Sequence, residues 1–452
     1  MLTEDDVHAL QPGLEAFHAR FGQFFPRSES RAWSRKYLTG LLLPIERKNV
    51  ENLAEQVGGH PRRLQEFVSE SPWDDAGCIE EVQRMIGEKL GTREGVLVLD
   101  DTGFPKKGKC SAGVGRQYSG TLGRTDNCQV GVFVSYASEK GHTLVDRRLY
   151  LLRSWFETEA VVSPKAGLPA GLEFQTKPEL ATEMLREITK AGHLPYRWVT
   201  ADADYGDHHD LRQAVADLGA WYCFDVSSTA KVWTGDPDWK VPPQGRGRPP
   251  KWPKPTANSP EPLTVAELIA SLPEAVWVRH RVTEGARGPR EYEFARLRVV
   301  EMRHQQPGPW AWLMARRRVG HPDEEVKYYL SNAPEDVGLE RMAWAACLRW
   351  TIEENFKAAK GEVGLDHYEV TRYRGWYHHV TLALMALAFL RLTQREWAAG
   401  KKRTRQRAGD PGAAGGRAAA ARVERQDRAR LASRSAASER RCSAGSPSAL
   451  VA

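Results

Sequence analysis

Apolar side chains recur at intervals of three or four residues along the N-terminal part of the chain. The spacing is clearest over Val7–Phe21, Trp33–Leu43 and Ile79–Leu90, and it places the apolar residues of each stretch on one face of a helix. Pro61 follows two glycines and favours the start of a further helix. The pattern predicts a helical segment over residues 1–90.

The pattern changes at Val96–Leu99, a continuous apolar run typical of a strand that is buried on both faces. This run ends in Asp100 and Asp101. Two later runs, Gln129–Tyr136 and Leu144–Leu151, are also predicted to be strands, with a glycine in the turn between them. Together the three runs predict a meander that starts beside the two aspartates.

Helical and extended patterns then alternate. Glu179–Lys190 has helical spacing, and the short strand Arg197–Ala201 runs directly into Asp202. A helix over Leu211–Leu218 and a strand over Trp221–Phe224 follow. Strands and helices in this order predict a layered α/β fold with a mixed sheet.

A second group of strands follows a stretch rich in Pro and Gly. Residues 234–262 break the periodic pattern, which predicts a loop. Four runs beyond it predict the strands of a β-rich insertion: Val276–Val282, Tyr292–Val300, Trp310–Met314 and Glu325–Leu330.

Helical spacing returns near Leu339 and again over Trp376–Arg395. Beyond it the chain is rich in Ala, Gly, Arg and Ser and poor in large apolar residues, which predicts a disordered basic tail. Five parts are therefore expected: a helical N-terminal domain (1–90), the first part of an α/β core (91–230), a loop and β insertion (231–335), a helical end of the core (336–396) and the tail (397–452).

Composition indicates an ordinary globular protein, with 41% hydrophobic and 27% charged residues in a chain of 452. The net charge of +7 favours a polyanionic partner, although much of the excess lies in the tail. Six cysteines without a CxxC pair predict neither a disulfide framework nor a zinc site. The acidic N-terminus does not resemble a signal peptide, and the longest apolar run is too short to span a bilayer. We expect a cytoplasmic protein without a membrane partner.

One helical stretch, residues 349–360, carries an unusual row of side chains. At about 100° per residue, Arg349, Glu353, Phe356 and Lys360 fall on one narrow face. A carboxylate between two cations suits a site where a metal ion meets a phosphate backbone. A solvated row of ion pairs explains the same spacing equally simply.

Acidic residues also follow two of the predicted strands, at Asp100/Asp101 and at Asp202. A buried strand end that carries carboxylates needs a partner for them, and a metal ion is one such partner. Capping or turn aspartates are the alternative. Two-metal phosphoryl transfer needs carboxylates that converge on ions about 3.5–4 Å apart, and Glu353 supplies a third acidic site.

The glycine-rich stretch between Gly103 and Asn127 carries many cations, including Lys106 and Lys107. It is predicted to be a long loop, either simply exposed or following a phosphate backbone beside the acids.

These motifs resemble those of the DDE-type transposases of bacterial insertion sequences, in the branch with a Tyr-x2-Arg-x3-Glu-x6-Lys signature and a β insertion. Arg349, Glu353 and Lys360 match this spacing, whereas Ala346 stands in the Tyr position. The family's Asp-x-Thr motif selects Asp100, with Asp101 as a near-equal candidate. Its Asp-Ala-x-Tyr-Gly motif selects Asp202, although Asp204 occupies a position that is commonly small.

The resemblance implies a ribonuclease-H-like fold and a DNA transposase with endonuclease and strand-transfer activity. It implies that Asp100 or Asp101, Asp202 and Glu353 bind two Mg²⁺ ions, for which Mn²⁺ substitutes. It also implies that Arg349 and Lys360, helped by Lys106 and Lys107, contact DNA. The expected partners are double-stranded DNA, as terminal inverted repeats and target, and a second copy of the chain in the DNA complex at the nucleoid. The helical N-terminal domain is a further candidate for DNA binding. A decayed or domesticated transposase that only binds DNA is the alternative.

Overall fold

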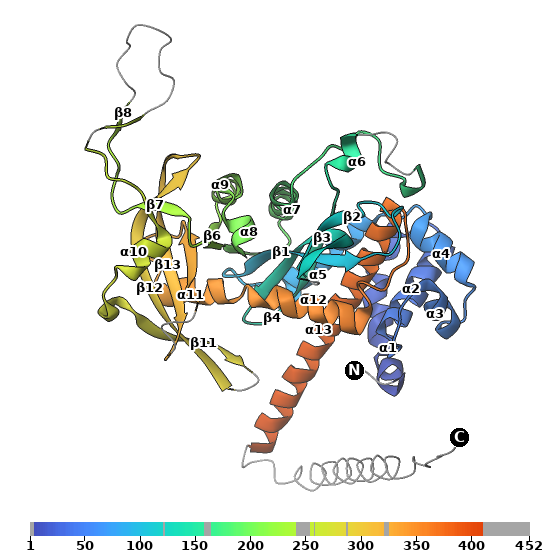
Figure 1. Ribbon diagram of the computed structural model, residues 1–452. Coiled ribbons are helices and arrows are strands. Elements are labelled where there is room, and N and C mark those ends of the chain that lie inside the picture. The colour runs from blue at the N-terminus through green and yellow to red at the C-terminus, as the bar shows by residue number, and fades with distance from the viewer. Residues whose placement is uncertain are drawn as a thin grey trace, which may run out of the picture. The chain divides into compact units, whose positions relative to one another are not determined.

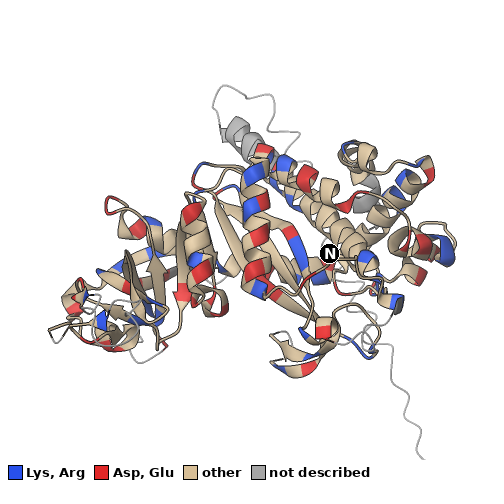
Figure 2. Cartoon of the chain, turned by 90° about the horizontal axis from the view of Figure 1, so that it is seen from above, with Lys and Arg blue, Asp and Glu red and all other residues tan. Residues whose placement is uncertain are grey.

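The computed structural model describes residues 4–120, 123–157, 164–240, 254–256, 258–285, 288–320 and 325–409. Contacts between residues divide the chain into one compact unit that ends at Arg391 and a second unit from Leu392 onwards. Within the first unit, basic and acidic residues are interspersed along the elements (Figure 2).

The N-terminal part of the chain is helical, as the apolar spacing predicts. Its α-helices are α1 (Glu4–Ala19), α2 (Ser28–Leu42), α3 (Val50–Gln56), α4 (Pro61–Ser69) and α5 (Asp75–Leu90).

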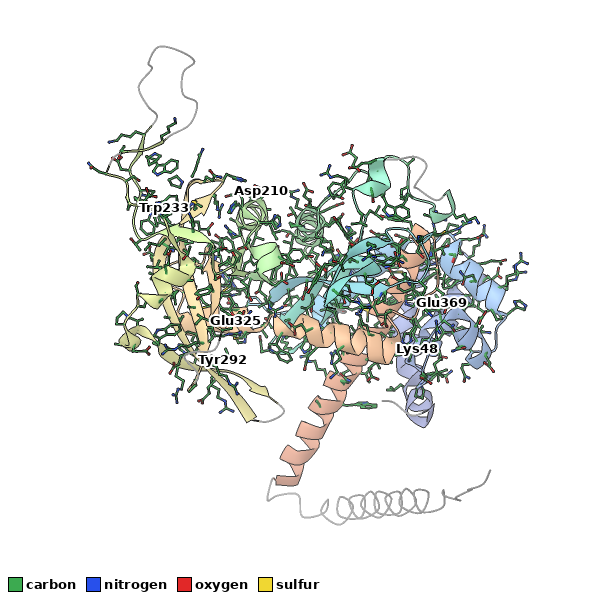
Figure 3. All side chains as sticks on the ribbon, in the orientation of Figure 1. Lys48, Asp210, Trp233, Tyr292, Glu325 and Glu369 are labelled. Carbon is green, nitrogen blue, oxygen red and sulfur yellow. The ribbon has the colours of Figure 1, made fainter. Side chains whose placement is uncertain are left out.

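These helices are tied to a helix from the far end of the sequence, α12 (Trp350–Val363). The buried Lys48 (labelled in Figure 3) donates hydrogen bonds from Nζ to the carbonyl oxygens of Leu41 at 2.6 Å, Leu43 at 2.6 Å and Glu362 at 2.7 Å. One ammonium group thus satisfies carbonyls at the C-terminal ends of both α2 and α12.

The core is a mixed sheet, which confirms the α/β and ribonuclease-H-like prediction. Strand β1 pairs antiparallel with β3 and parallel with β5, while β3 pairs with β4 and β5 runs parallel to β6. The strands are β1 (Val96–Pro105), β3 (Arg124–Ser138), β4 (Gly141–Tyr150), β5 (Trp198–Ala201) and β6 (Trp221–Val226). All four residues of the run Val96–Leu99 are fully buried at the centre of this sheet.

Helices cover both faces of the core sheet (Figure 1). Helices α7 (Lys177–Ala191) and α9 (His209–Asp217) lie on one face, and α12 lies on the other. Helix α7 begins with a capping box between Thr176 and Glu179, so its start is defined by local sequence.

The prediction of a long loop over residues 103–127 is wrong. Strand β1 continues to Pro105, and a further strand, β2 (Gly115–Ser119), pairs with the start of β3. The hydrophobic pattern does not reveal β2 because its inward-facing residues, Gln117 and Ser119, are polar and yet buried.

The four predicted strands of the insertion are present, and they extend the core sheet. Strand β14 pairs antiparallel with β6, so core and insertion share one hydrogen-bonded sheet of twelve strands within the described residues. The insertion strands are β11 (Val278–Gly285), β12 (Gly288–Arg303), β13 (Gln306–Arg318) and β14 (Lys327–Ser331).

The predicted loop over residues 234–262 contains two short strands, β8 (Trp239–Lys240) and β9 (Lys254–Pro255), and its residues 241–253 and 257 lie outside the described residues. Two further short strands flank it, β7 (Lys231–Trp233) and β10 (Leu263–Thr264). The remaining short helices of the described chain are α6 (Ser154–Glu157), α8 (Ala203–Gly206) and α10 (Val265–Ala270), with 3-10 turns η1 (Gly22–Phe24), η2 (Pro164–Ala166) and η3 (Glu274–Val276).

The C-terminal part of the first unit is helical, as expected. Helix α11 (Leu339–Cys347) ends just before α12, and α13 begins at Tyr373. Helix α13 continues to Gly409, beyond its expected end at Arg395, and the rest of the predicted tail, 410–452, lies outside the described residues. In the described part of the chain, no helix combines the length and apolar character needed to cross a bilayer.

Candidate active site

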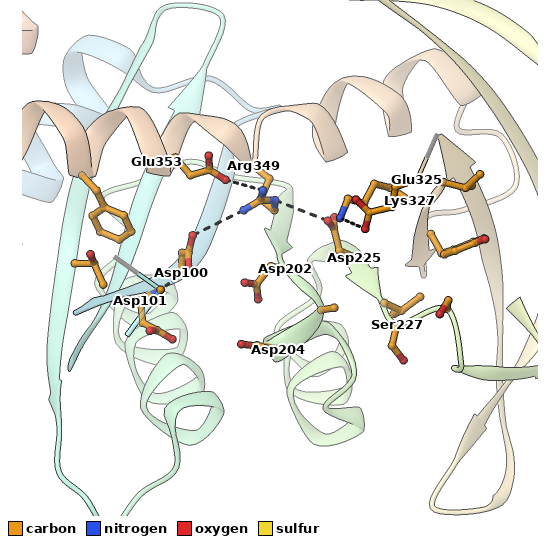
Figure 4. Close-up of a pocket in the computed structure, with 18 of the residues that line it drawn as sticks. Asp100, Asp101, Asp202, Asp204, Asp225, Ser227, Glu325, Lys327, Arg349 and Glu353 are labelled. Atoms are coloured by element: carbon orange, nitrogen blue, oxygen red, sulfur yellow. Dashed lines mark hydrogen bonds and ion pairs between the residues drawn. The ribbon is translucent and has the colours of Figure 1, made fainter. Parts of the chain in front are cut away.

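A cavity of about 920 Å³ opens at one edge of the core sheet (Figure 4). Its walls come from the middle of β1, the end of β6, the start of β14, the segment after β5, and α12. Six residues expected at the site from the sequence line it: Asp100, Asp101, Asp202, Arg349, Glu353 and Lys360.

Strand register explains why Asp100 and Asp202 meet although a hundred residues separate them. Leu99 of β1 is level with Ala201 of the parallel strand β5. The next residue in each segment is therefore an aspartate, and residues at the same level of neighbouring parallel strands lie side by side.

Asp100 lies in the interior of the site. Burial, together with the nearby charges of Asp202 and Asp101, raises the pKa of its carboxyl to about 8. The backbone N–H of Asp101 donates to Asp100 Oδ1 at 2.7 Å, and Arg349 lies close by, and both oppose this rise. Burial likewise raises the pKa of Asp202, together with the charge of Asp204. A cation is the natural partner of such a pair.

Asp101 points to different partners, since successive residues of a strand face opposite sides of the sheet. Its Oδ2 accepts a hydrogen bond from Lys177 Nζ at 2.9 Å and from the Tyr205 hydroxyl at 3.1 Å. Asp101 is therefore already paired with residues of α7 and α8, whereas Asp100 faces Arg349 and α12.

Arg349 lies among the carboxylates, at the N-terminal boundary of α12. Its Nη2 donates to Glu353 Oε1 at 2.7 Å, and its Nη1 lies 3.8 Å from Asp100 Oδ2. The expected helical face is thus present, and Phe356 of the same face is buried against the sheet. Glu353 remains more than half exposed, with 58% of its side chain accessible, so it is free to turn towards another partner.

Asp225 is a further carboxylate of this site, and the sequence analysis missed it. It lies near the end of β6, in the same sheet edge, with Oδ2 at 3.8 Å from Arg349 Nε. Burial raises its pKa to about 6, against the opposing effect of Arg349. Among the described residues, its buried Oδ1 has no hydrogen-bond partner. The signal available was the one that selected Asp202, an acid at the end of a short apolar strand.

The predicted lysines occupy three different environments. Lys360 Nζ donates to Thr102 Oγ1 at 2.9 Å and to the Gly103 carbonyl at 3.3 Å, so it holds the end of β1 beside the acids. Lys106 lies outside the cavity, with Nζ 3.0 Å from the Tyr368 carbonyl oxygen and 3.5 Å from the centre of the Tyr368 ring. Burial lowers the pKa of Lys106 to about 8. Lys107 is exposed and also lies outside the cavity.

The cavity carries an excess of negative charge. Of the described residues that line it, seven are Asp or Glu and four are Lys or Arg, a formal excess of three negative charges. Oxygen ligands of this kind are those that Mg²⁺ prefers. In the described part of the chain, no three Asp, Glu, His or Cys side chains form a group ready to hold an ion, and the Arg349 guanidinium stands between the acids. The donor set and the unpartnered Asp225 oxygen fit a hard divalent cation that would compete with Arg349 for these carboxylates.

Comparison with known proteins assigns the chain to a family. The family model of DDE superfamily endonucleases matches residues 20–289, more than half of the chain, and the chain therefore belongs to this family. It is also similar to a protein described as a probable transposase for insertion sequence element IS701, from Microchaete diplosiphon. The two are 27% identical over 345 residues, which cover 75% of this chain and 77% of the relative. The aspartates of the cavity lie within the family match, and Arg349 and Glu353 lie beyond it.

Proposed function

We propose that this protein is an insertion-sequence transposase. It would cut phosphodiester bonds at the ends of its element and join the resulting 3′-OH to target DNA. One observation carries the proposal: Asp100, Asp202 and Glu353, from three distant segments of a DDE endonuclease chain, line one acidic cavity.

The proposed metal ligands are Asp100, Asp202 and Glu353, for two Mg²⁺ ions that Mn²⁺ would replace. When bound, such ions acidify the attacking water and stabilise the leaving oxygen. We assign Asp100 rather than Asp101 to this set because Lys177 and Tyr205 already engage the Asp101 carboxylate.

The cations of α12 have separate proposed tasks. Arg349 neutralises Asp100, Asp225 and Glu353 while no DNA is bound, and it turns its terminal nitrogens to a backbone phosphate when the carboxylates take another partner. Lys360 of α12 contributes positive charge, because its hydrogen bonds to Thr102 and Gly103 hold its ammonium group against β1. We propose no direct role in the cavity for Lys106, which is held against Tyr368, or for Lys107.

The proposed partner is double-stranded DNA, first as terminal inverted repeats and then as target. Two ends must be held together for joining, so a homodimer is proposed in the DNA complex. Such a reaction takes place on chromosomal DNA and therefore at the nucleoid. The helical segment 1–90 is proposed as an additional DNA contact.

The decisive experiment compares Glu353→Ala with Glu354→Ala on duplex DNA that carries the inverted repeats flanking the gene. Glu354 is the adjacent carboxylate and points instead to His142, with Oε2 3.5 Å from Nε2. We expect Glu353→Ala to abolish Mg²⁺-dependent strand cleavage and to retain DNA binding, and Glu354→Ala to cleave normally. Chelation by EDTA should abolish wild-type cleavage, and Mn²⁺ should restore it. Full cleavage by Glu353→Ala would remove Glu353 from the catalytic set.

The same experiment tests the alternative, a protein that binds DNA without cutting it. The departure at Ala346, which is buried in α11, favours this alternative. Specific binding of the repeats by the wild-type protein, with no nicking in either Mg²⁺ or Mn²⁺, would support it.

A further inference from the structure

Strand β2 and the first residues of β3 form a two-stranded ribbon that continues beyond the end of β1. Cys128 of β3 is level with Pro105, the last residue of β1, and from there towards its start β3 pairs with β2 instead. The ribbon extends to the pair Ser119–Arg124. Because Ser119 nevertheless lies against Gly103, the ribbon folds back over the last part of β1, beside the acidic cavity.

The ribbon is held against β1 just beyond the acids. Ser119 is buried, and a Cβ placed on Gly103 would lie 2.2 Å from Ser119 Oγ. Only glycine at position 103 allows this approach, three residues after Asp100. The next residue of the ribbon, Gly120, lines the cavity itself. The position of the ribbon beside the proposed active site is thus determined by packing.

The opposite face of the ribbon is exposed. Gln117 and Ser119 face inwards, so the alternate residues Arg116 and Tyr118 face outwards. Tyr118 exposes 61% of its surface, more than any other large hydrophobic residue in the described part of the chain. A bare aromatic ring on a strand that adjoins an active site is a typical stacking platform.

Cations lie on the same ribbon and on the loop that is held against it. Asn127, which is paired with Arg116 across the ribbon, donates from Nδ2 to the carbonyl oxygens of Lys106 at 2.6 Å and Gly108 at 2.9 Å. These bonds hold the loop that carries the exposed Lys107 and Lys109 against the ribbon. Among the described residues, neither these two lysines nor Arg116 forms an ion pair with an acid.

The cations of this surface offset the repulsion between a DNA backbone and the acidic cavity. Residues 397–452 contain 13 Lys and Arg and 4 Asp and Glu, so the rest of the chain has a net charge of −2. The cavity itself has three excess negative charges. A phosphate backbone approaches such a site only where local cations offset the repulsion.

We propose that the outer face of the ribbon, formed by Arg116, Tyr118, Lys107 and Lys109, binds the DNA next to the scissile phosphate. The cations hold backbone phosphates, and the Tyr118 ring stacks on a base exposed at the cut end. This inference rests on the proposed transposase function and adds a specific DNA contact to it.

The test measures binding of a fluorescent duplex that carries the inverted repeat and is already cut at the element boundary, with Ca²⁺ in place of Mg²⁺. Tyr118→Ala should weaken binding about 5-fold to 100-fold, whereas Tyr118→Phe, which keeps the ring, should bind like the wild type. Arg116→Ala should weaken binding and reduce the slope of log affinity against log salt by about 1. Lys190→Ala, which removes an exposed cation from α7, is the control and should change neither affinity nor slope.

Strand-transfer kinetics and thermal melting separate a binding role from a structural one. Tyr118→Ala should raise KM for the pre-cut duplex, leave kcat nearly unchanged and melt at the wild-type temperature. Wild-type affinity of Tyr118→Ala would overturn the inference, as would an equal loss in Tyr118→Phe. These outcomes are independent of the proposed catalysis, because a wild-type protein that binds DNA without cutting it still reveals the effect of Tyr118 on affinity. A wild-type protein that does not bind this duplex would refute both proposals.

Discussion

Arg349 spans the candidate active site and contacts Asp225 with one edge of its guanidinium group. Nε lies 3.8 Å from Asp225 Oδ2, while Nη2 on the opposite side donates to Glu353 at 2.7 Å. Asp225 therefore lies beside the nitrogen nearest the aliphatic part of the arginine side chain, and Glu353 contacts a terminal nitrogen. If Glu353 turns to a metal ion, the contact with Asp225 can remain.

The first prediction concerns this contact. Asp225→Asn removes the negative charge beside Arg349 Nε, which helps to orient the arginine side chain. The cleavage rate should fall by about tenfold to a hundredfold, as is usual for groups that orient a ligand or a catalytic side chain. The measurement is single-turnover cleavage of end-containing duplex. Asp217→Asn, where the exposed aspartate accepts a hydrogen bond from Gln213 at the end of α9 and does not line the cavity, should leave the rate unchanged.

In an Arg349→Met background, Asp225→Asn should cause little additional loss, because the residue through which it acts is absent. If Asp225→Asn lowers the cleavage rate as much in the Arg349→Met background as in the wild type, Asp225 acts independently of Arg349, for example as a metal ligand.

The second prediction separates the two adjacent aspartates of β1. Asp100→Asn should abolish detectable Mg²⁺-dependent nicking, because Asp100 faces Arg349 and Glu353 across the cavity. Asp101→Asn should retain measurable nicking and should mainly lower thermal stability, because it weakens the contacts with Lys177 and Tyr205. Both variants are measured for nicking and melting in parallel. Nicking by Asp100→Asn together with none by Asp101→Asn would reverse the assignment.

The third prediction concerns acid stability. His378 and His379 are buried at the start of α13, where Nδ1 of His378 lies 2.9 Å from the Val68 carbonyl oxygen and Nδ1 of His379 lies 2.8 Å from the Tyr37 hydroxyl. Burial lowers the pKa of each to about 3, from an ordinary value near 6.5.

Both rings are neutral in the folded and the unfolded chain above pH 6.5, so this contribution to stability is complete there. Between pH 6.5 and pH 3 the unfolded chain takes up protons that the buried rings do not, and the free energy of unfolding falls. The expected slope is about 1.4 kcal/mol per pH unit for each histidine. Urea unfolding at pH 7 and pH 5 should show a smaller decrease for His379→Gln than for the wild type. The exposed His208→Gln should keep the wild-type decrease.

Local sequence was sufficient for most of the secondary structure. The apolar run Val96–Leu99 predicts a strand at the centre of the sheet because every side chain in it must be buried. The spacing of Arg349, Glu353 and Phe356 predicts a helix with these residues on one face, and α12 carries them at this place in the chain. Segments whose burial matches their polarity can be predicted in this way.

Where burial and polarity disagree, the sequence pattern fails. The pattern does not predict β2, because Gln117 and Ser119 are buried and polar. It predicts a loop around Lys106, whose side chain instead packs on Tyr368. Each of these positions depends on a partner from a distant segment, which no local pattern reveals.

The sequence by itself determined that acids stand at strand ends and that a carboxylate lies between cations on a helix. Only the tertiary structure decided which acids share a cavity, because the register of β1, β5 and β6 sets the level of each strand end. That register brought Asp225 beside Arg349, while the pairing of β2 with β3 placed Tyr118 two residues before Gly120, which lines the cavity. The physical reason is that the acids lie on neighbouring strands of the sheet. Which strands are neighbours, and at what level they pair, is determined by the packing of the whole sheet.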